Sequence, residues 1–185
     1  MNTENNPISV SYQTSIFAVY LVTSILVSSK LNMKKTALFP GSFDPFTKGH
    51  EAIVHKALGV FDHVIILLAE NTSKQTMFSL DKRMEHIAGI FEDNHSVSVQ
   101  KFSGLTVDFC KQQNIKHIIR GLRDSKDFQY ERSIAHINLE LSGGIETIFF
   151  LTDLHLSAIN SSIVREIYKN QGDINQFVTR PALLV

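Results

Sequence analysis

The sequence predicts an α/β fold in a single domain. Short apolar runs alternate along the chain with segments whose apolar residues recur at helical spacing. One run, residues 64–69 (VIILLA), is apolar throughout, as expected of a strand that is covered on both faces. Strands separated by helices run parallel and are joined by right-handed crossovers. We therefore expect a Rossmann-like, five-stranded parallel sheet with helices on both faces.

The strands are expected at residues 36–39, 64–69, 97–102, 118–120 and 147–151. The helix after the first strand places these apolar residues on one side: Ile53, Val54, Ala57, Leu58 and Phe61. The helix after the second strand has Ser79 as its expected N-cap. Its apolar face consists of Leu80, Met84, Ile87, Ala88 and Phe91.

The third helix has Thr106, Phe109 and Cys110 on one side. A long fourth helix is expected from about Phe128 to Leu141, where Gly143-Gly144 ends it. Its inward residues are predicted to be Tyr130, Ile134, Ile137 and Leu141. The last helix is expected at residues 161–170, with Ser161 or Ser162 as its N-cap.

The composition limits the classes of partner. The chain has 185 residues, of which 43% are apolar and 19% charged, and its formal net charge is zero. A broad electrostatic surface for nucleic acid or for an acidic membrane is therefore not indicated, and any anion site must be local. Cys110 is the single cysteine, which fits a reducing compartment, and we expect a cytoplasmic protein.

Residues 1–32 differ from the rest, since they are rich in Asn, Ser and Thr with one apolar run at residues 16–27. That run is shorter than the roughly 20 residues of a membrane span, and no Lys or Arg precedes it as in a signal peptide. We expect Met33 to be the natural start, residues 1–32 to take no part in the fold, and residues 33–185 to form the domain. The alternative is a weak membrane-surface anchor.

The loop at residues 39–50 (FPGSFDPFTKGH) is the most informative stretch. Two Pro and two Gly give it an unusual path between the first strand and the first helix. His50 falls at the start of that helix, where free N–H groups and the helix dipole favour phosphate. The loop is neither GxGxxG nor a P-loop. It predicts a nucleotide-phosphate site; the alternative is a structural loop with an incidental surface histidine.

Polar residues follow all five predicted strands, and the carboxyl ends of parallel strands meet at one sheet edge. Among them His50, Lys74, Arg120 and Arg123 come to that edge together with several hydroxyls, a combination that suits several phosphates. The segments are 42–50, 70–74, 103–106, 120–124 and 152–162.

Several of these residues also have structural interpretations. Lys74 fits a solvated loop lysine, and Glu131 fits a solvent-facing helix position. Arg120 ends a buried strand, where a charge is costly unless paired, so a functional role is favoured. Asp44 is expected to brace its loop. The other histidines are interpreted as structural or exposed, and Cys110 as a core residue.

Several motifs make the chain from Met33 to about Val178 resemble the bacterial phosphopantetheine adenylyltransferase family. Residues 47–50 (TKGH) match the [HT]xGH signature of nucleotidylyltransferases, and residues 120–123 (RGLR) with 127–131 (DFQYE) distinguish this family from the others. Further matching segments are 40–45, 61–64, 135–138, 159–162 and 171–173.

This resemblance implies transfer of the adenylyl group of ATP to 4′-phosphopantetheine by direct in-line attack, giving dephospho-coenzyme A and pyrophosphate without a covalent intermediate. It implies His50 as the catalytic residue, which stabilises the transition state. It implies that the acceptor contacts Ser42, Lys74, Thr106 and Arg120. It implies that ATP contacts Ser42, Phe43, His50, Gly121, Leu122, Arg123, Glu131, Leu156, Ser157, Ala158, Ile159, Asn160, Ser161 and Ser162. Mg²⁺ is expected to arrive with ATP, without a dedicated metal site in the protein.

The resemblance also implies a homohexamer and inhibition by coenzyme A, with no nucleic-acid or membrane partner. The chain departs from the family pattern at Asn160, Leu156, Thr106 and, conservatively, at Ser42. One alternative function is a related transferase acting on glycerol phosphate or nicotinamide mononucleotide. The other is a nucleotide-binding regulatory protein without catalysis.

Overall fold

The structure is a computed structural model that describes residues 34–70 and 75–184. The predicted leader at residues 1–32 and Lys74 lie outside the described residues. The described residues from Lys35 onward form one compact unit, so the single α/β domain is confirmed.

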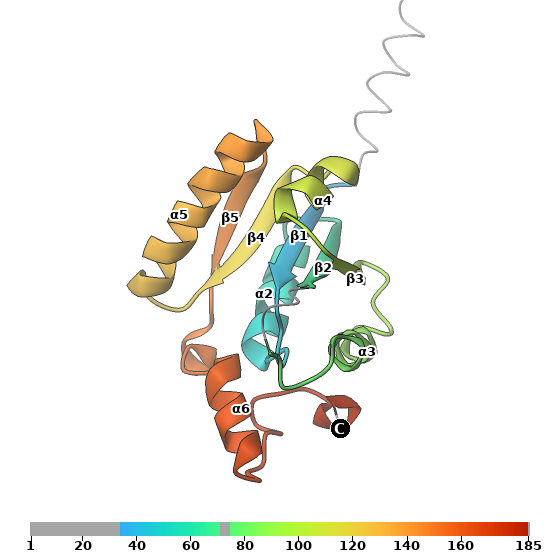
Figure 1. Ribbon diagram of the computed structural model, residues 1–185, viewed down its shortest axis with the longest axis vertical. Helices are drawn as coiled ribbons and strands as arrows, with labels where there is room; N and C mark the ends of the chain where they lie inside the picture. Colours follow the sequence, from blue (N-terminus) through green and yellow to red (C-terminus); the bar gives the residue numbers. More distant parts are fainter. Residues whose placement is uncertain (1–33, 71–74, 185) are drawn as a thin grey trace, which may run out of the picture. The chain divides into compact units, whose positions relative to one another are not determined.

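Five parallel strands form one sheet in the order β3-β2-β1-β4-β5 (Figure 1). Their bounds are β1 Thr36–Gly41, β2 His63–Ala69, β3 Val97–Phe102, β4 His117–Leu122 and β5 Glu146–Leu151. The chain order reverses direction at the β1–β4 pair, which is the switch point where ligands bind in open parallel sheets. β4 continues two residues past its expected end, so Arg120 lies within the strand.

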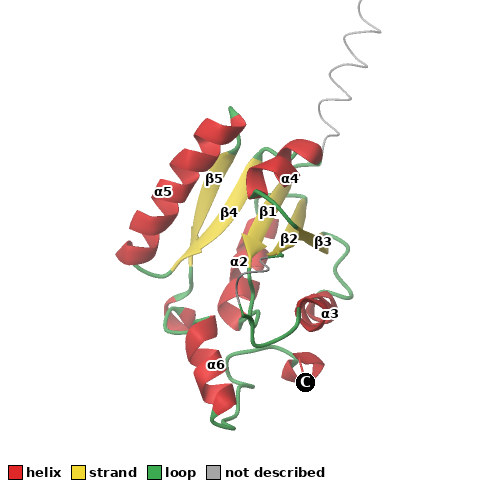
Figure 2. Cartoon of the chain, viewed as in Figure 1, coloured by secondary structure: helices red, strands yellow, loops and turns green. Residues whose placement is uncertain are grey.

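Helices cover both faces of this sheet, as predicted (Figure 2). Their bounds are α2 Lys48–Leu58, α3 Leu80–Ile90, α4 Thr106–Gln112, α5 Ser125–Ser142 and α6 Ser161–Lys169. Two 3₁₀ turns, η1 Leu154–Leu156 and η2 Pro181–Leu184, complete the described elements. Among these elements, none is a helix of the length and apolar character that crossing a bilayer requires.

Alternating residues of β1 reach opposite faces because strand side chains alternate. Ala37 and Phe39 join the core beneath α2 and α3. Leu38 joins the core beneath α4, where Cys110 is buried as predicted. A third cluster holds α6 against the C-terminal segment, and includes Phe78, Val164, Ile174, Val178 and Leu184.

The predicted inward face of α5 is wrong for three of its four residues, whereas Ile134 is partly buried. Tyr130 is 68% exposed, Ile137 59% and Leu141 51%, and no residue of α5 is fully buried. α5 packs on α4, β4 and β5, which leaves the opposite side of the helix uncovered in the described chain. This leaves an apolar stripe of the helix facing outward.

Two smaller predictions also need correction. Ala88 is exposed, whereas His86 on the same helix is buried and its Nε2 lies 2.7 Å from the Thr179 carbonyl oxygen. The N-cap of α6 is Asn160, whose Oδ1 accepts from the Ile163 N–H at 2.9 Å. Asn160 therefore performs the capping role that the sequence assigned to Ser161 or Ser162.

The cap predicts a stability effect. Replacing Asn160 with Ala should lower the free energy of unfolding by about 1 kcal/mol, whereas Asn160→Ser should stay close to the unchanged protein because serine also caps. Urea unfolding at constant m-value measures this. Equal midpoints for the Ala and Ser variants would contradict the capping role.

Candidate active site

The β1–α2 loop is fixed at the carboxyl end of β1. Phe43 adopts a φ of 45°, rare for a residue with a side chain, and its buried ring packs edge-on to Phe39 and Phe46. Asp44 braces the loop as expected: its carboxylate accepts from the N–H groups of Met77 and Phe78 at 2.9 and 3.0 Å. The loop is therefore anchored before α2 begins.

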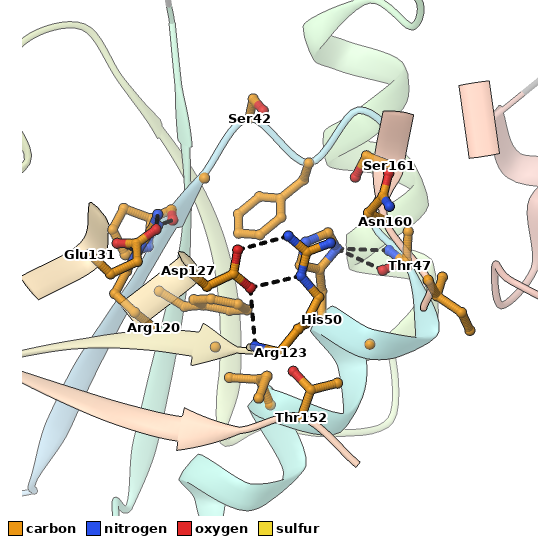
Figure 3. Close-up of a pocket in the computed structure, with 18 residues that line it drawn as sticks. Ser42, Thr47, His50, Arg120, Arg123, Asp127, Glu131, Thr152, Asn160 and Ser161 are labelled. Carbon is orange, nitrogen blue, oxygen red and sulfur yellow. Dashed lines mark hydrogen bonds and ion pairs between the residues drawn. The ribbon is translucent and has the colours of Figure 1, made fainter. Parts of the chain in front are cut away.

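His50 occupies the third position of α2 and completes a capping box with Thr47 (Figure 3). The Thr47 backbone N–H donates to His50 Nδ1 at 2.9 Å. Because Nδ1 accepts, the proton of the neutral imidazole lies on Nε2, which remains able to donate. The helix start thus selects one tautomer of His50.

The charge of His50 follows from its surroundings. Burial, followed by the nearby charges of Arg120 and Arg123, lowers its pKa from 6.5 to about 4. Phe43 packs edge-on to the imidazole at a ring distance of 5.2 Å. At neutral pH His50 is therefore an uncharged hydrogen-bond donor.

Arg120 is held within β4 by three hydrogen bonds. Its Nε and Nη2 donate to the two carboxylate oxygens of Glu131 at 2.7 and 2.5 Å, and its Nη1 donates to the Pro40 carbonyl at 2.5 Å. This bidentate pair fixes the plane of the guanidinium. It also places Glu131 of α5 against the switch point.

Arg123 forms a second bidentate pair, with Asp127, four residues along. Its Nε and Nη2 donate to the carboxylate at 2.8 and 2.9 Å, and this pairing raises the pKa of Arg123 and lowers that of Asp127. Both predicted arginines at the sheet edge are thus neutralised by carboxylates of α5.

A cavity of about 300 Å³ opens between β1, β4 and the starts of α2 and α6. It brings together most of the predicted ATP contacts: Ser42, Phe43, His50, Gly121, Arg123, Glu131, Ile159, Asn160 and Ser161. Gly121 permits α2 to pack closely on β4, since a Cβ there would lie 2.9 Å from Ile53 Cγ1.

Some predicted ATP residues do not line this cavity: Leu122, Leu156, Ser157, Ala158 and Ser162. Leu122 is buried in the sheet. The Ser157 hydroxyl donates to the Leu154 carbonyl at 2.7 Å, and the Ser162 hydroxyl accepts from Arg165 at 3.1 Å. Their contacts with ATP stay predictions.

The residues that line this cavity and are absent from the predicted set include the polar residues Asp127 and Thr152. Asp127 lies in the first turn of α5, where its carboxylate accepts from the Arg123 N–H just before the helix, whereas the expected helix begins only at about Phe128. Thr152 directly follows β5, so the rule that site residues follow strands marks it.

A second cavity of about 320 Å³ adjoins the first. Its walls include Thr106 at the start of α4 and Ile134, Asn138 and Leu141 of α5. The two cavities share Pro40, Gly41, Ser42, Arg120 and Glu131. Three of the four predicted acceptor contacts, namely Ser42, Thr106 and Arg120, line this second cavity; the fourth, Lys74, lies outside the described residues.

The fold and the histidine at the start of α2 define a nucleotidyltransferase, and the family model described as Cytidylyltransferase-like matches residues 38–167. A Vibrio parahaemolyticus structure described as a nicotinate-nucleotide adenylyltransferase superposes with a TM-score of 0.60 over 82% of this chain and 90% of that one. At 18% identity, it shows the fold alone.

Relatives of higher sequence identity show which nucleotidyltransferase family the chain belongs to. The chain is 46% identical to the phosphopantetheine adenylyltransferase of Cytophaga hutchinsonii, over 79% of this chain and 97% of that protein. It is 47% identical to the enzyme of the same name from Flavobacterium psychrophilum, over 78% and 95%. The chain therefore belongs to the phosphopantetheine adenylyltransferase family.

The environment of His50 predicts its titration. Followed by ¹⁵N NMR, the ring should remain in the neutral Nε2–H form from pH 8 down to about pH 5, since its pKa is about 4. Arg123→Gln should raise that pKa by removing one nearby charge. Titration of His50 near pH 6.5 in the unchanged protein would contradict this electrostatic account.

The same pKa has a consequence for stability. Between pH 6.5 and about 4 the unfolded chain binds a proton at His50 that the folded protein does not. His50 therefore lowers the free energy of unfolding progressively as the pH falls through this window.

Proposed function

We propose that this protein transfers the adenylyl group of ATP to 4′-phosphopantetheine, giving dephospho-coenzyme A and pyrophosphate. The observation that carries the proposal is the pair of adjoining cavities that share Arg120 and Ser42. A reaction between two phosphate-bearing substrates needs two sites whose phosphate ends meet. The acceptor follows from the relatives, which are named for phosphopantetheine.

ATP would occupy the cavity at His50, with its phosphates at the start of α2, where helix N–H groups favour anions. The acceptor would place its phosphate at Ser42 and Arg120 and its arm along the second cavity toward Thr106. The apolar side chains of Ile134 and Leu141 suit the methylene and methyl groups of such an arm.

In the proposed step, an oxygen of the acceptor phosphate attacks the α-phosphorus of ATP while the bond from that phosphorus to the bridging oxygen of the β-phosphate breaks. Pyrophosphate leaves with the electron pair. His50 donates its Nε2 proton as a hydrogen bond to an α-phosphate oxygen, where charge develops. Catalysis then consists of positioning and charge stabilisation.

Glu131 has a clearer role as the partner of Arg120 than as an ATP contact. Its bidentate bonds leave Arg120 with free N–H groups in a fixed plane, so an incoming phosphate meets an oriented donor. We propose that Glu131 orients Arg120 for the acceptor phosphate.

Magnesium would enter with ATP and neutralise phosphate charge. The two carboxylates that line the ATP cavity, Asp127 and Glu131, are engaged by arginines. Among the described residues no cluster of three or more His, Cys, Asp or Glu is arranged for a metal. We propose that the nucleotide phosphates hold the ion.

The assay is pyrophosphate release from ATP, measured with 4′-phosphopantetheine and with the alternative acceptors glycerol 3-phosphate and nicotinamide mononucleotide. We expect pyrophosphate release with 4′-phosphopantetheine as the acceptor and not with the other two acceptors. Preference for another acceptor would indicate a related transferase, and ATP binding without release would indicate a regulatory protein.

In the same assay, His50→Ala should lower kcat by about 10²-fold or more because one transition-state donor is lost. His50→Gln, which retains an N–H donor near the Nε2 position, should keep more activity than the Ala variant. Turnover of the Ala variant close to that of the unchanged protein would exclude the donor role.

We further propose a cytoplasmic homohexamer, inhibited by coenzyme A through occupation of the acceptor cavity. The exposed stripe of α5 supports an assembly, since Tyr130, Ile137 and Leu141 would be covered by another copy. Leu141 also lines the second cavity, so a neighbouring subunit there would help to enclose the acceptor.

Sedimentation velocity tests this assembly. The sedimentation of the unchanged protein should correspond to a mass six times that of the chain. Ile137→Lys should dissociate this assembly while the circular dichroism spectrum is retained. Val60→Lys is the matched control, because Val60 is similarly exposed at 57% but lies after α2, away from the stripe. A monomeric unchanged protein would contradict the proposal.

A further inference from the structure

Arg83 is a buried cation that the proposed reaction does not use. It lies on α3 and is 4% exposed, and burial lowers its pKa. Its Nε donates to the Phe78 carbonyl at 3.0 Å, and its Nη1 donates to the Ser42 carbonyl. Within the described part of the chain, no carboxylate forms a direct ion pair with it; Asp44, the nearby acid, pairs with Arg165 at 3.9 Å.

Arg83 is one half of a clamp between two loops, which we call the Asp44–Arg83 clamp. Asp44, only 5% exposed, reaches from the β1–α2 loop to the N–H groups of Met77 and Phe78. Arg83 reaches back from α3 to Ser42 and also holds the Phe78 carbonyl. The two side chains thus tie residues 42–44 to residues 77–78 in both directions.

The Asp44–Arg83 clamp holds Ser42, a residue that lines both cavities. Ser42 lies at the boundary where the two substrates would meet. The adjoining Phe43 has a φ of 45°, so the loop does not follow a relaxed backbone path at this point. Because the Arg83 guanidinium holds the Ser42 carbonyl, it also determines the position of the Ser42 hydroxyl.

A buried guanidinium is costly to desolvate, and an apolar side chain of similar volume often stabilises a fold equally well. Arg83 is therefore better explained by precise placement of its two carbonyl partners than by stability. We infer that Arg83 is a positioning residue, resting on the proposed function, which acts through Ser42 and holds its hydroxyl at the boundary between nucleotide and acceptor.

A double-mutant cycle tests this inference with four proteins: the unchanged protein, Ser42→Ala, Arg83→Lys, and the double variant. The lysine keeps the charge but lacks the planar fork that donates from two separate nitrogens, Nε and Nη1. Arg83→Lys alone should lower kcat about tenfold or more, because small misplacement at a reacting centre is costly. In the Ser42→Ala background the same change should cost about twofold or less, since coupled residues are not additive.

The control is Arg180→Lys, since Arg180 also donates to a carbonyl of α3, that of Gly89, but lies away from both cavities. It should leave kcat unchanged in both backgrounds. Equal losses from Arg83→Lys with and without the Ser42 hydroxyl would overturn the inference, as would turnover of Arg83→Lys equal to that of the unchanged protein. If Arg83→Lys does not fold, Asp44→Asn replaces it in the cycle, with the same expected coupling.

The ATP dissociation constant of each of the four proteins is also measured by calorimetry. If the unchanged protein binds ATP but releases no pyrophosphate with 4′-phosphopantetheine, the proposed function fails while these four constants still test the coupling. Non-additive constants would support the role of Arg83, and additive constants would overturn it.

Discussion

The ion pair between Arg120 and Glu131 is the interaction on which the architecture of the site depends. A guanidinium within β4, beside the central strand β1, is tolerable only if its charge and its donors are satisfied. Glu131 supplies two acceptors and the Pro40 carbonyl a third. In meeting that requirement, the pair forms the boundary between the two cavities and joins α5 to the switch point of the sheet.

The site is prepared for phosphate without an excess of free positive charge in the described residues. Arg120 and Arg123 are each paired with a carboxylate, and His50 is neutral with its Nε2 proton available. On the proposed function, such a site would recognise phosphate through oriented donors and the start of α2, more than through net charge. This local recognition also agrees with the zero formal charge of the whole chain, which provides no broad attraction for polyanions.

The sheet was predictable from the sequence because its strands are short apolar runs, and the clustering of polar residues at one edge followed from strand direction alone. The outward face of α5 was not predictable, because Tyr130, Ile137 and Leu141 have the spacing of a buried stripe and periodicity does not reveal what covers it.

The partners of Arg120 and the tautomer of His50 could not be predicted, because they depend on contacts that form only in the folded chain. Arg83 resembles any charged residue of an amphipathic helix until its burial is known. Lys74 lies outside the described residues, so its role stays a prediction.

The central claim is that nucleotide and acceptor occupy separate cavities that meet at Ser42 and Arg120. The most direct measurement is a crystal structure with the product dephospho-coenzyme A bound. We expect the adenosine in the cavity lined by His50 and Gly121, the pantetheine arm in the cavity lined by Thr106 and Asn138, and the phosphates between them at Arg120. A product that lies entirely within one cavity, with Arg120 away from its phosphates, would contradict the account.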